Sequence, residues 1–224
     1  MGVSPNFNKG SVFRALVLVA LMVGAVASYR QALNRRGFSP ARVVATASVL
    51  VVLPPAVKDS AELLAMFRED QADRILPSAQ IDWPTVTARD KRRREEVQRM
   101  LATGRVVTAL DHYHAAMIYQ HGPKVEDSRK AHELALRSMQ LDGGNRRARW
   151  LVAASKDREL IRLGQPQRYG TQFRQVRKGF WELYPVMSGV SDDERFRYGV
   201  SSLATMRSQI AVRNAGGKAT LLGD

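Results

Sequence analysis

The sequence predicts an all-α protein: an irregular helical bundle of helix-loop-helix pairs, preceded by one or two N-terminal hydrophobic helices. Two observations support this fold class. From residue 58 onward, apolar residues recur every three or four positions, and glycine or proline breakers separate the periodic segments. Over the same stretch, no alternating run of useful strand length is visible. Because no internal repeat of tetratricopeptide length appears, we do not expect a regular array.

The expected helices follow one another between short loops. Their ranges are residues 61–76, 90 to about 100, 106–120, 126–141, 146–163, 180–184 and 192–212. Residues 77–84, which contain Trp83, and the turn-rich stretch 165–173 are expected to be loops. The chain is thus expected to contain three parts: a membrane anchor or signal region at 1–57, a helical domain at 58–213 and a flexible tail at 214–224.

The composition excludes several classes of protein. A length of 224 residues fits one ordinary domain plus an appendage, and 45% apolar residues suffice for a hydrophobic core. Charged residues make up 25% of the chain, a proportion usual in globular proteins, which argues against wholesale disorder. The absence of cysteine excludes disulfides, thiolate zinc sites, iron–sulfur clusters and thiol catalysis.

The chain is strongly basic, because 35 Lys and Arg residues outnumber 21 Asp and Glu residues and give a formal charge of +14. Such a charge favours anionic partners such as nucleic acid, phospholipid head groups or acidic envelope polymers. The basic residues form three groups: Arg30, Arg35, Arg36 and Arg42; Arg89, Lys91, Arg92, Arg93, Arg94 and Arg99; Arg146, Arg147 and Arg149. Nucleic-acid readers usually interleave aromatic or glycine-rich elements with such groups, and none occurs here. We therefore interpret them as solvated helix faces and juxtamembrane charge, and do not expect nucleic acid as a partner.

Two apolar runs precede the helical domain. Residues 12–29 read VFRALVLVALMVGAVASY, with Arg14 as the one charged residue, near the start of the run. A helix of that length spans about 27 Å, close to the roughly 30 Å thickness of the hydrocarbon layer. The second run, residues 43–57, is short for a complete span, and Pro54 and Pro55 are expected to stop or kink it.

Four arrangements of these runs remain open. Ala25-Val26-Ala27 resembles a signal-peptidase site; alternatively the second run is the export signal, preceded by Arg35, Arg36 and Arg42. If both runs form a membrane hairpin, the arginines between them face the cytoplasm by the positive-inside rule. These three arrangements place the helical domain outside the cytoplasm, whereas a single span with the second run in the interface leaves it inside. We favour export, with the chain at the cell membrane and the helical domain on the periplasmic side.

Polar residues interrupt the apolar stripes of the expected helices. Residues three or four apart share a helix face, and Asp70, Asp111 and Asp157 each continue the apolar stripe of their own helix. Three such carboxylates suggest that the helices share a polar core. Buried carboxylates need partners, because an unpaired one costs several kcal/mol. The candidate partners are Arg74, Arg158, His114, His121 and His132.

Two interpretations of this polar core remain. It is either a network of salt bridges and hydrogen bonds that fixes helix register, which we favour, or a pocket for acid–base chemistry. Under the second interpretation the candidate catalytic residues are Asp70, His121 and Asp157. His114 and His121 lie two turns apart, too far to share one metal ion. Because no HExxH motif, phosphate-binding loop or Rossmann fingerprint occurs, we expect neither a metal site nor a cofactor.

Four short motifs lie in order along residues 63–172. They are Glu69-Asp70-Gln71 with Arg74, Gln120-His121, Asp157-Arg158, and Gln167-Arg168-Tyr169-Gly170-Thr171-Gln172. In order and spacing they resemble an uncharacterised family of bacterial proteins, a domain of unknown function with an EDQ…R opening and a QxYGTQ ending. The resemblance implies no particular activity. It implies that these polar positions belong together and that an export signal precedes the domain.

The stripes and motifs together define a predicted polar core or binding site. Its members are Glu69, Asp70, Gln71, Arg74, Asp111, His114, His121, Asp157, Arg158, Gln167, Tyr169, Thr171 and Gln172. The last four supply neutral donors and acceptors, which can bind a sugar or a peptide backbone. They can equally tie the end of one helix to a neighbour, which is the commoner use.

Two functions fit these features. The first is a non-enzymatic accessory or scaffold protein of the bacterial cell envelope, such as an extrinsic subunit of a larger membrane complex. Its partners would be membrane lipids and other envelope or membrane-complex proteins. The alternative is an envelope hydrolase that uses aspartate and histidine as acid–base residues. A nucleic-acid binder comes third and requires a cytoplasmic domain.

Overall fold

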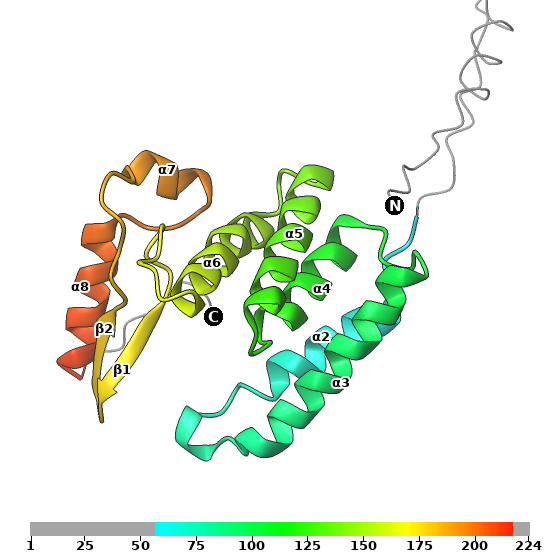
Figure 1. Ribbon diagram of the computed structural model, residues 1–224, viewed down its shortest axis with the longest axis horizontal. Coiled ribbons are helices and arrows are strands. Elements are labelled where there is room, and N and C mark those ends of the chain that lie inside the picture. Colours follow the sequence, from blue (N-terminus) through cyan, green and yellow to red (C-terminus); the bar gives the residue numbers. More distant parts are fainter. Residues whose placement is uncertain (1–56, 217–224) are drawn as a thin grey trace, which may run out of the picture. The chain divides into compact units, whose positions relative to one another are not determined.

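The computed structural model describes residues 57–216, which lie in one structural unit of the chain, Pro55–Asp224 (Figure 1). This part is mostly helical, as predicted, with one small two-stranded sheet. The expected N-terminal hydrophobic helices, at residues 12–29 and 43–57, fall outside it apart from residue 57. Within residues 57–216, no helix combines the length and the apolar character needed to cross a membrane.

Three consecutive helices form the centre of the unit: α4 (Ala109–Gln120), α5 (Val125–Leu141) and α6 (Arg146–Arg162). Each packs against the next along the chain (Figure 1). Alanines occupy fully buried positions on all three helices, namely Ala115, Ala116, Ala131, Ala135, Ala148, Ala153 and Ala154. Small side chains at the contacts allow the helix axes to approach closely. The positions of His121 and of the α6 side chains are therefore fixed by a tightly packed core.

Helices α2 (Ala61–Ala72) and α3 (Trp83–Ala102) cover α4. A 3-10 turn, η1 (Ser78–Gln80), connects them. The helix predicted for residues 61–76 ends four residues earlier. Trp83, expected in a loop, begins α3 because the side chain of Asp82 accepts a hydrogen bond from the Thr85 amide and caps the helix.

Side-chain caps explain most of the helix starts. The capping residues are Ser60, Asp82, Thr108, Asn145, Ser191 and Ser202, and each accepts a hydrogen bond from a first-turn amide. At Thr108 the cap is reciprocal, because the Asp111 side chain accepts from the Thr108 amide. Helix α4 therefore begins at Ala109, three residues after the predicted start at residue 106.

A β-hairpin follows α6, and here the prediction that no strand occurs after residue 58 is wrong. Strand β1 (Phe173–Arg177) pairs antiparallel with β2 (Phe180–Leu183), with Phe173 opposite Leu183. Residues 180–184 were expected to be helical. The side chains of β1 after Phe173 are all exposed, so the hairpin lacks the apolar alternation that reveals a half-buried strand. Gly179, at φ +77°, makes the turn between the strands.

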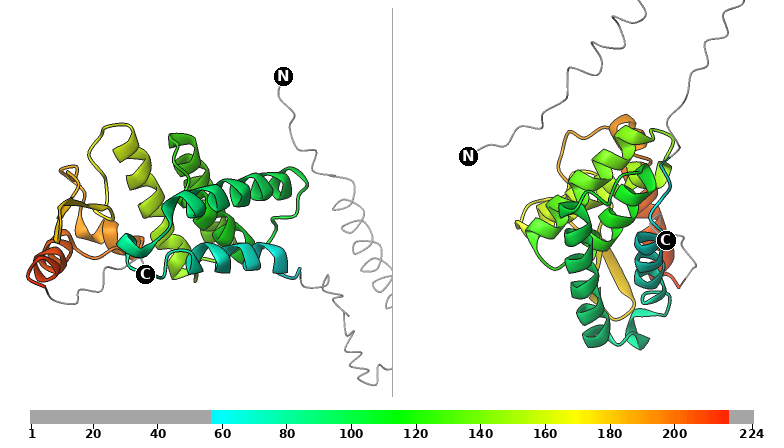
Figure 2. Two further views of the ribbon diagram at one scale, coloured as in Figure 1. Left: turned by 90° about the horizontal axis from the view of Figure 1, so that it is seen from below. Right: turned by 90° about the vertical axis from the view of Figure 1, so that its right-hand side faces the viewer.

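The expected helix at residues 192–212 is two helices, α7 (Asp192–Arg197) and α8 (Leu203–Asn214). Gly199, at φ +70°, breaks the helix between them. Helix α8 packs on β2, and Figures 1 and 2 show it grouped with the hairpin, apart from α3 and α4. Asn214, the first residue of the predicted tail, ends α8 and exchanges two hydrogen bonds with the backbone of Trp181.

Candidate functional site

A fully buried carboxylate on α2, Asp70, is hydrogen-bonded to His121 at the end of α4. Nδ1 of His121 lies 3.0 Å from the carboxylate. The carboxylate also accepts from Nη1 of Arg74 at 3.0 Å and from Nε2 of Gln71 at 2.8 Å. Three members of the predicted site therefore converge on Asp70.

The charge state of Asp70 fixes the tautomer of His121. Burial raises the pKa of Asp70, but the hydrogen bond and charge of His121 and the charge of Arg74 outweigh burial, so its pKa lies below the ordinary value. An ionised carboxylate can only accept, so Nδ1 of His121 carries the proton. In the neutral form of this tautomer, the other ring nitrogen, Nε2, carries a lone pair. Nε2 has no hydrogen-bond partner in the described part of the chain, and 18% of the side chain is exposed.

An ion-pair ladder between α2 and α3 holds Arg74 in place. Its Nη2 pairs with Asp90, whose other oxygen accepts from Nη2 of Arg93 at 2.6 Å. The same Arg93 nitrogen donates to Asp73 at 2.7 Å, and Asp73 also pairs with Arg89. Arg74 is thus shared between two carboxylates and is not free to follow a ligand.

Arg158 of α6 reaches the same region from the other side, but it meets only neutral oxygens. Its Nη1 donates to the backbone carbonyl of Gln120 at 2.7 Å, and its Nε and Nη2 donate to Oε1 of Gln172 at 3.3 and 3.0 Å. Among residues 57–216, no carboxylate lies within 4.0 Å of this guanidinium. Burial, together with the charges of Arg162 and Arg74, lowers its pKa to about 10.

Asp157, the third candidate catalytic residue, is fully buried and binds a loop of its own chain. One carboxylate oxygen accepts from the amides of Arg168 at 2.7 Å and Tyr169 at 2.8 Å; the other accepts from the amide of Thr171 at 2.9 Å and its hydroxyl at 2.8 Å. No cation is among its partners within the described residues, in contrast to the cationic partner that we expected. Burial raises the pKa of Asp157, and these four hydrogen bonds only partly offset that effect.

The loop that Asp157 holds is further tied by its own glutamines. Nε2 of Gln167 donates to the carbonyls of Gln172 and Tyr184, both at 2.9 Å, and its Oε1 accepts from the Gln172 amide. Tyr169 packs edge-on against Tyr198. These neutral groups therefore tie the end of a helix to its neighbours, which was the commoner of the two uses expected from the sequence, the other being the binding of a sugar or peptide backbone. The exception is the side chain of Gln172, which donates to Thr171 and accepts from Arg158.

A continuous hydrogen-bonded path therefore joins most of the predicted site. It runs from Asp157 through Thr171, Gln172, Arg158 and the Gln120 carbonyl to the chain segment of His121, and from His121 to Asp70, Arg74 and Asp90. Four helices and one loop contribute to it.

Other predicted members lie apart from this path. Asp111 is buried but caps α4, accepting from the amides of Ser60 at 2.8 Å and Thr108 at 3.0 Å. His114 stacks on Phe67 with ring centroids 4.5 Å apart, and burial lowers its pKa. Glu69 is exposed on α2. These three residues serve the fold rather than the group around His121.

Arg162 is the main residue of the region that the sequence reasoning missed. It donates to Oγ of Ser128 and to the carbonyl of Gly122. The available signal was its spacing, because Arg158 and Arg162 are four residues apart and share one face of α6. Gly122 is also sterically required, since an added Cβ would lie 2.3 Å from Cγ of Asp127.

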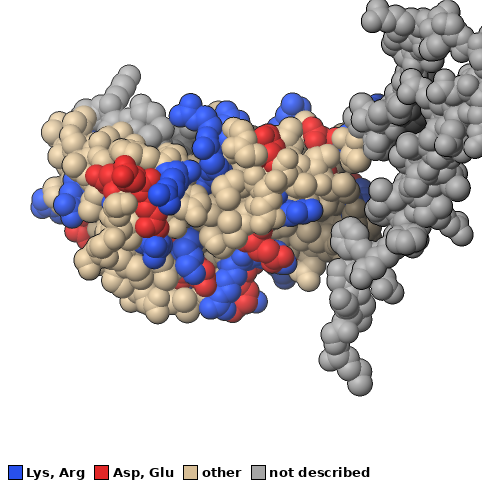
Figure 3. All heavy atoms as spheres, turned by 90° about the horizontal axis from the view of Figure 1, so that it is seen from above, with Lys and Arg blue, Asp and Glu red and all other residues tan. Residues whose placement is uncertain are grey.

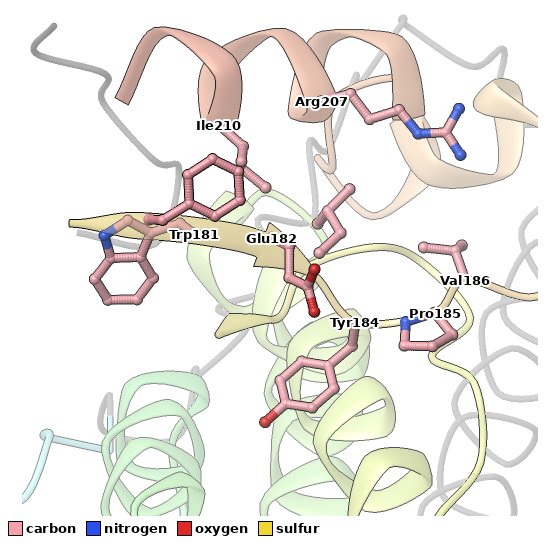
Figure 4. Close-up of a pocket in the computed structure, with 9 residues that line it drawn as sticks. Trp181, Glu182, Tyr184, Pro185, Val186, Arg207 and Ile210 are labelled. Atoms are coloured by element: carbon pink, nitrogen blue, oxygen red, sulfur yellow. The ribbon is translucent and has the colours of Figure 1, made fainter. Parts of the chain in front are cut away.

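An open groove of about 460 Å³ lies between β2 and α8, outside the predicted cluster (Figure 4). Aromatic and aliphatic side chains line it together with Glu182 and Arg207. Its link to the cluster is Tyr184, which lines the groove and whose backbone carbonyl accepts a hydrogen bond from Nε2 of Gln167.

Charge on the visible surface is mixed. Figure 3 shows Lys and Arg interspersed with Asp and Glu over one face, without a single extended basic stripe there. Some of the surface arginines are paired with glutamates, as in Arg174–Glu182 and Arg168–Glu194. Among residues 57–216, no three His, Asp or Glu side chains are grouped so that they could hold a metal ion.

Comparisons with family models, with curated proteins and with solved structures found no match to this chain. The resemblance of the four motifs to an uncharacterised bacterial family therefore stays a prediction, and the site must be interpreted from its own geometry.

Replacing Asp157 by Ala is expected to lower the free energy of unfolding by several kcal/mol. Two buried amides, a part-buried amide and a buried hydroxyl lose their acceptor, and an unsatisfied buried group costs about 1–3 kcal/mol. Asp157→Asn is expected to cost less, because its one oxygen still accepts from Arg168 and Tyr169. Urea unfolding measures both, with the exposed Asp193→Ala as a control that stays within about 0.5 kcal/mol of wild type. An Ala variant as stable as the wild type would refute the anchoring role.

Replacing Asp70 by Asn is expected to cost about 3 kcal/mol at pH 7, because it breaks a buried ion pair. Since the pKa of Asp70 is lower in the folded chain, its contribution is full above the ordinary value of 3.8 and is lost as pH falls through the lowered value. The stability difference between wild type and variant should therefore shrink in acid. Urea unfolding at neutral and acidic pH tests this, with the neighbouring Glu69→Gln as control. A difference that does not change with pH contradicts the assignment.

Proposed function

We propose that this protein is an envelope hydrolase in which His121 is the general base and Asp70 is its positioning residue. One observation carries the proposal: the buried carboxylate of Asp70 binds Nδ1 of His121 and leaves Nε2 without a hydrogen-bond partner among the described residues. The same division of labour between carboxylate and imidazole operates in hydrolases of unrelated folds. Asp157, the remaining candidate, supports the site by anchoring the loop that holds Gln172.

The proposed reaction is hydrolysis of an ester. Nε2 of His121 takes a proton from a water molecule as the water oxygen bonds to the electrophilic carbon or phosphorus. The ester bond then breaks, and its oxygen leaves with the proton returned from Nε2, so that no proton or electron is gained or lost overall. Asp70 stabilises the imidazolium that exists between these two transfers.

Arg158 has the donors for a developing oxyanion. A guanidinium carries five N–H groups, and three of those on Arg158 are used by Gln120 and Gln172. One N–H therefore remains on each terminal nitrogen. Donors that are already fixed before the reaction stabilise a transition-state charge effectively, because they need no reorganisation.

The proposed location is the cell membrane, with the helical domain on the periplasmic side. The apolar runs at residues 12–29 and 43–57 and the basic residues between them support membrane attachment. The resemblance to a bacterial family with an export signal ahead of its domain supports placing the helical domain on the periplasmic side. Phospholipid is then a neighbour of the domain, and lipid head groups are natural anionic contacts for the basic chain.

A second candidate function, an envelope scaffold, is favoured by a different surface. At the connection between α2 and α3, Ile75, Leu76 and Trp83 are 83%, 53% and 44% exposed. Clustered exposed apolar side chains of this kind often mark a protein or membrane contact. This surface suits a subunit of a membrane complex.

The hydrolase proposal predicts that His121→Gln lowers the rate of ester hydrolysis about 10²–10⁴-fold, the usual contribution of a general base. Activity is measured with a panel of chromogenic carboxylic and phosphoric esters, beside complementation of a deletion strain. His112→Gln is the matched control, because His112 on the same helix binds only the Thr108 carbonyl. Equal loss in both variants, or retained complementation by His121→Gln, would count against the proposal.

The scaffold candidate predicts that the full-length chain stays in carbonate-washed membranes and co-purifies with a partner in mild detergent. Replacing Ile75 and Leu76 by Ser should remove that partner, because it removes the exposed apolar contact. His121→Gln should retain it. If the double Ser variant keeps its partner, the α2–α3 connection is not the scaffold surface; recovery of the full-length chain in the soluble fraction would exclude membrane attachment.

A further inference from the structure

Two arginines of α6 differ from the other arginines around His121. Arg74, Arg89, Arg93 and Arg94 each have a carboxylate within 4.0 Å. Arg158 and Arg162 have none among residues 57–216. The nearest acidic influence on Arg162 is Asp127, which acts on it only from a distance. The site therefore holds two guanidinium groups without a directly paired anion.

Neutral oxygens hold these two groups on either side of His121. Arg158 donates to the carbonyl of Gln120, the residue before His121, and Arg162 donates to the carbonyl of Gly122, the residue after it. Their second holders are the side chains of Gln172 and Ser128. Both guanidinium groups are thus fixed against the backbone that carries the imidazole.

Bringing two cations together in a partly buried place is unfavourable unless an anion joins them. Both groups lie in places that disfavour a positive charge: burial and neighbouring positive charge lower the pKa of Arg158, and burial with the charge of Arg94 lowers that of Arg162 against the opposing effect of Asp127. An anion bound there would offset the positive charge around both groups. It would also find donors, because two N–H groups of Arg158 and three of Arg162 are not used in hydrogen bonds to the described residues.

We infer that Arg158 and Arg162 form a binding site for the phosphate group of a phosphate monoester, placed beside His121. A phosphate monoester carries a charge of about −1.5 to −2 at neutral pH and three strong acceptor oxygens. That charge matches two guanidinium groups, whereas a single carboxylate matches one. Arginine's planar fork also suits phosphate oxygens. The inference rests on the proposed function and names its substrate class: the ester that His121 hydrolyses is a phosphate monoester.

Binding is measured directly, by calorimetric titration of the full-length protein in detergent with inorganic phosphate, with acetate as the comparison anion at equal ionic strength. We expect saturable phosphate binding at least about tenfold tighter than acetate. Arg158→Gln and Arg162→Gln should each weaken phosphate binding by about tenfold or more, since each removes charge-assisted hydrogen bonds. Arg129→Gln is the matched control, because Arg129 is exposed and already paired with Glu159.

Two further variants separate charge from folding. Arg158→Lys keeps the charge but loses the fork, so its affinity should fall between wild type and Arg158→Gln. Gln172→Ala keeps the guanidinium but removes its holder, and should weaken binding without abolishing it. Thermal melts of all variants show whether each one folds. If Arg158→Gln folds and binds phosphate as tightly as wild type, or if acetate binds as tightly as phosphate, the inference is overturned.

The source of the phosphate is separated by two more probes, glycerol 3-phosphate and a short-chain phosphatidic acid. Tighter binding of the first indicates a soluble ester, and tighter binding of the second indicates a lipid head group; binding of neither overturns the inference. His121→Gln distinguishes this inference from the proposed function. Phosphate binding retained in that variant with activity lost supports both, while phosphate binding with no hydrolysis by the wild type keeps the anion site and removes the catalytic proposal.

Discussion

A carboxylate buried away from any cation must collect hydrogen bonds from neutral donors, and Asp157 finds four of them within one short loop. That requirement shapes the loop, because the backbone amides of Arg168, Tyr169 and Thr171 can point at one side chain only if the chain curls around it. The curled loop then presents Gln172 to Arg158, and Arg158 to the backbone beside His121. The geometry around the imidazole thus depends on a side chain that does not touch it.

The pKa values of two buried aspartates in the same helical unit are shifted in opposite directions. Asp70 faces a histidine and an arginine, which hold its pKa low, whereas Asp157 faces amides and a hydroxyl, and burial raises its pKa. An Asp70 that is ionised at neutral pH suits the task of orienting an imidazole and balancing its charge. Asp157, with every oxygen already occupied, has no capacity left for a substrate. Environment rather than residue type therefore assigns the working role to Asp70.

The surroundings also distinguish two groups of arginines, those paired with carboxylates and those held by neutral oxygens. The ladder of Arg74, Asp90, Arg93 and Asp73 neutralises itself and joins α2 to α3 as a rigid pair. Arg158 and Arg162 are instead fixed by neutral oxygens, so their positive charge is available to something outside the chain. An imidazole nitrogen without a partner among the described residues, next to cationic donors, is an arrangement that a purely structural network does not need. For this reason we favour chemistry over the fixing of helix register as the use of this core.

The sequence by itself determined the helices and the burial of their polar residues. Helical periodicity, capping residues and glycine breakers act within a few positions, so the ends of α5 and α6 and the buried positions of Asp70 and Asp157 were predictable from local patterns. Only the tertiary structure decided which buried groups meet. Asp111 and Asp157 satisfy the same helical pattern, but one caps a helix and the other anchors a distant loop, because partners far along the chain are set by packing. The hairpin was missed for a related reason. Its exposed strands are held by pairing with each other and by packing against α8, and neither contact requires apolar and polar residues to alternate along the sequence.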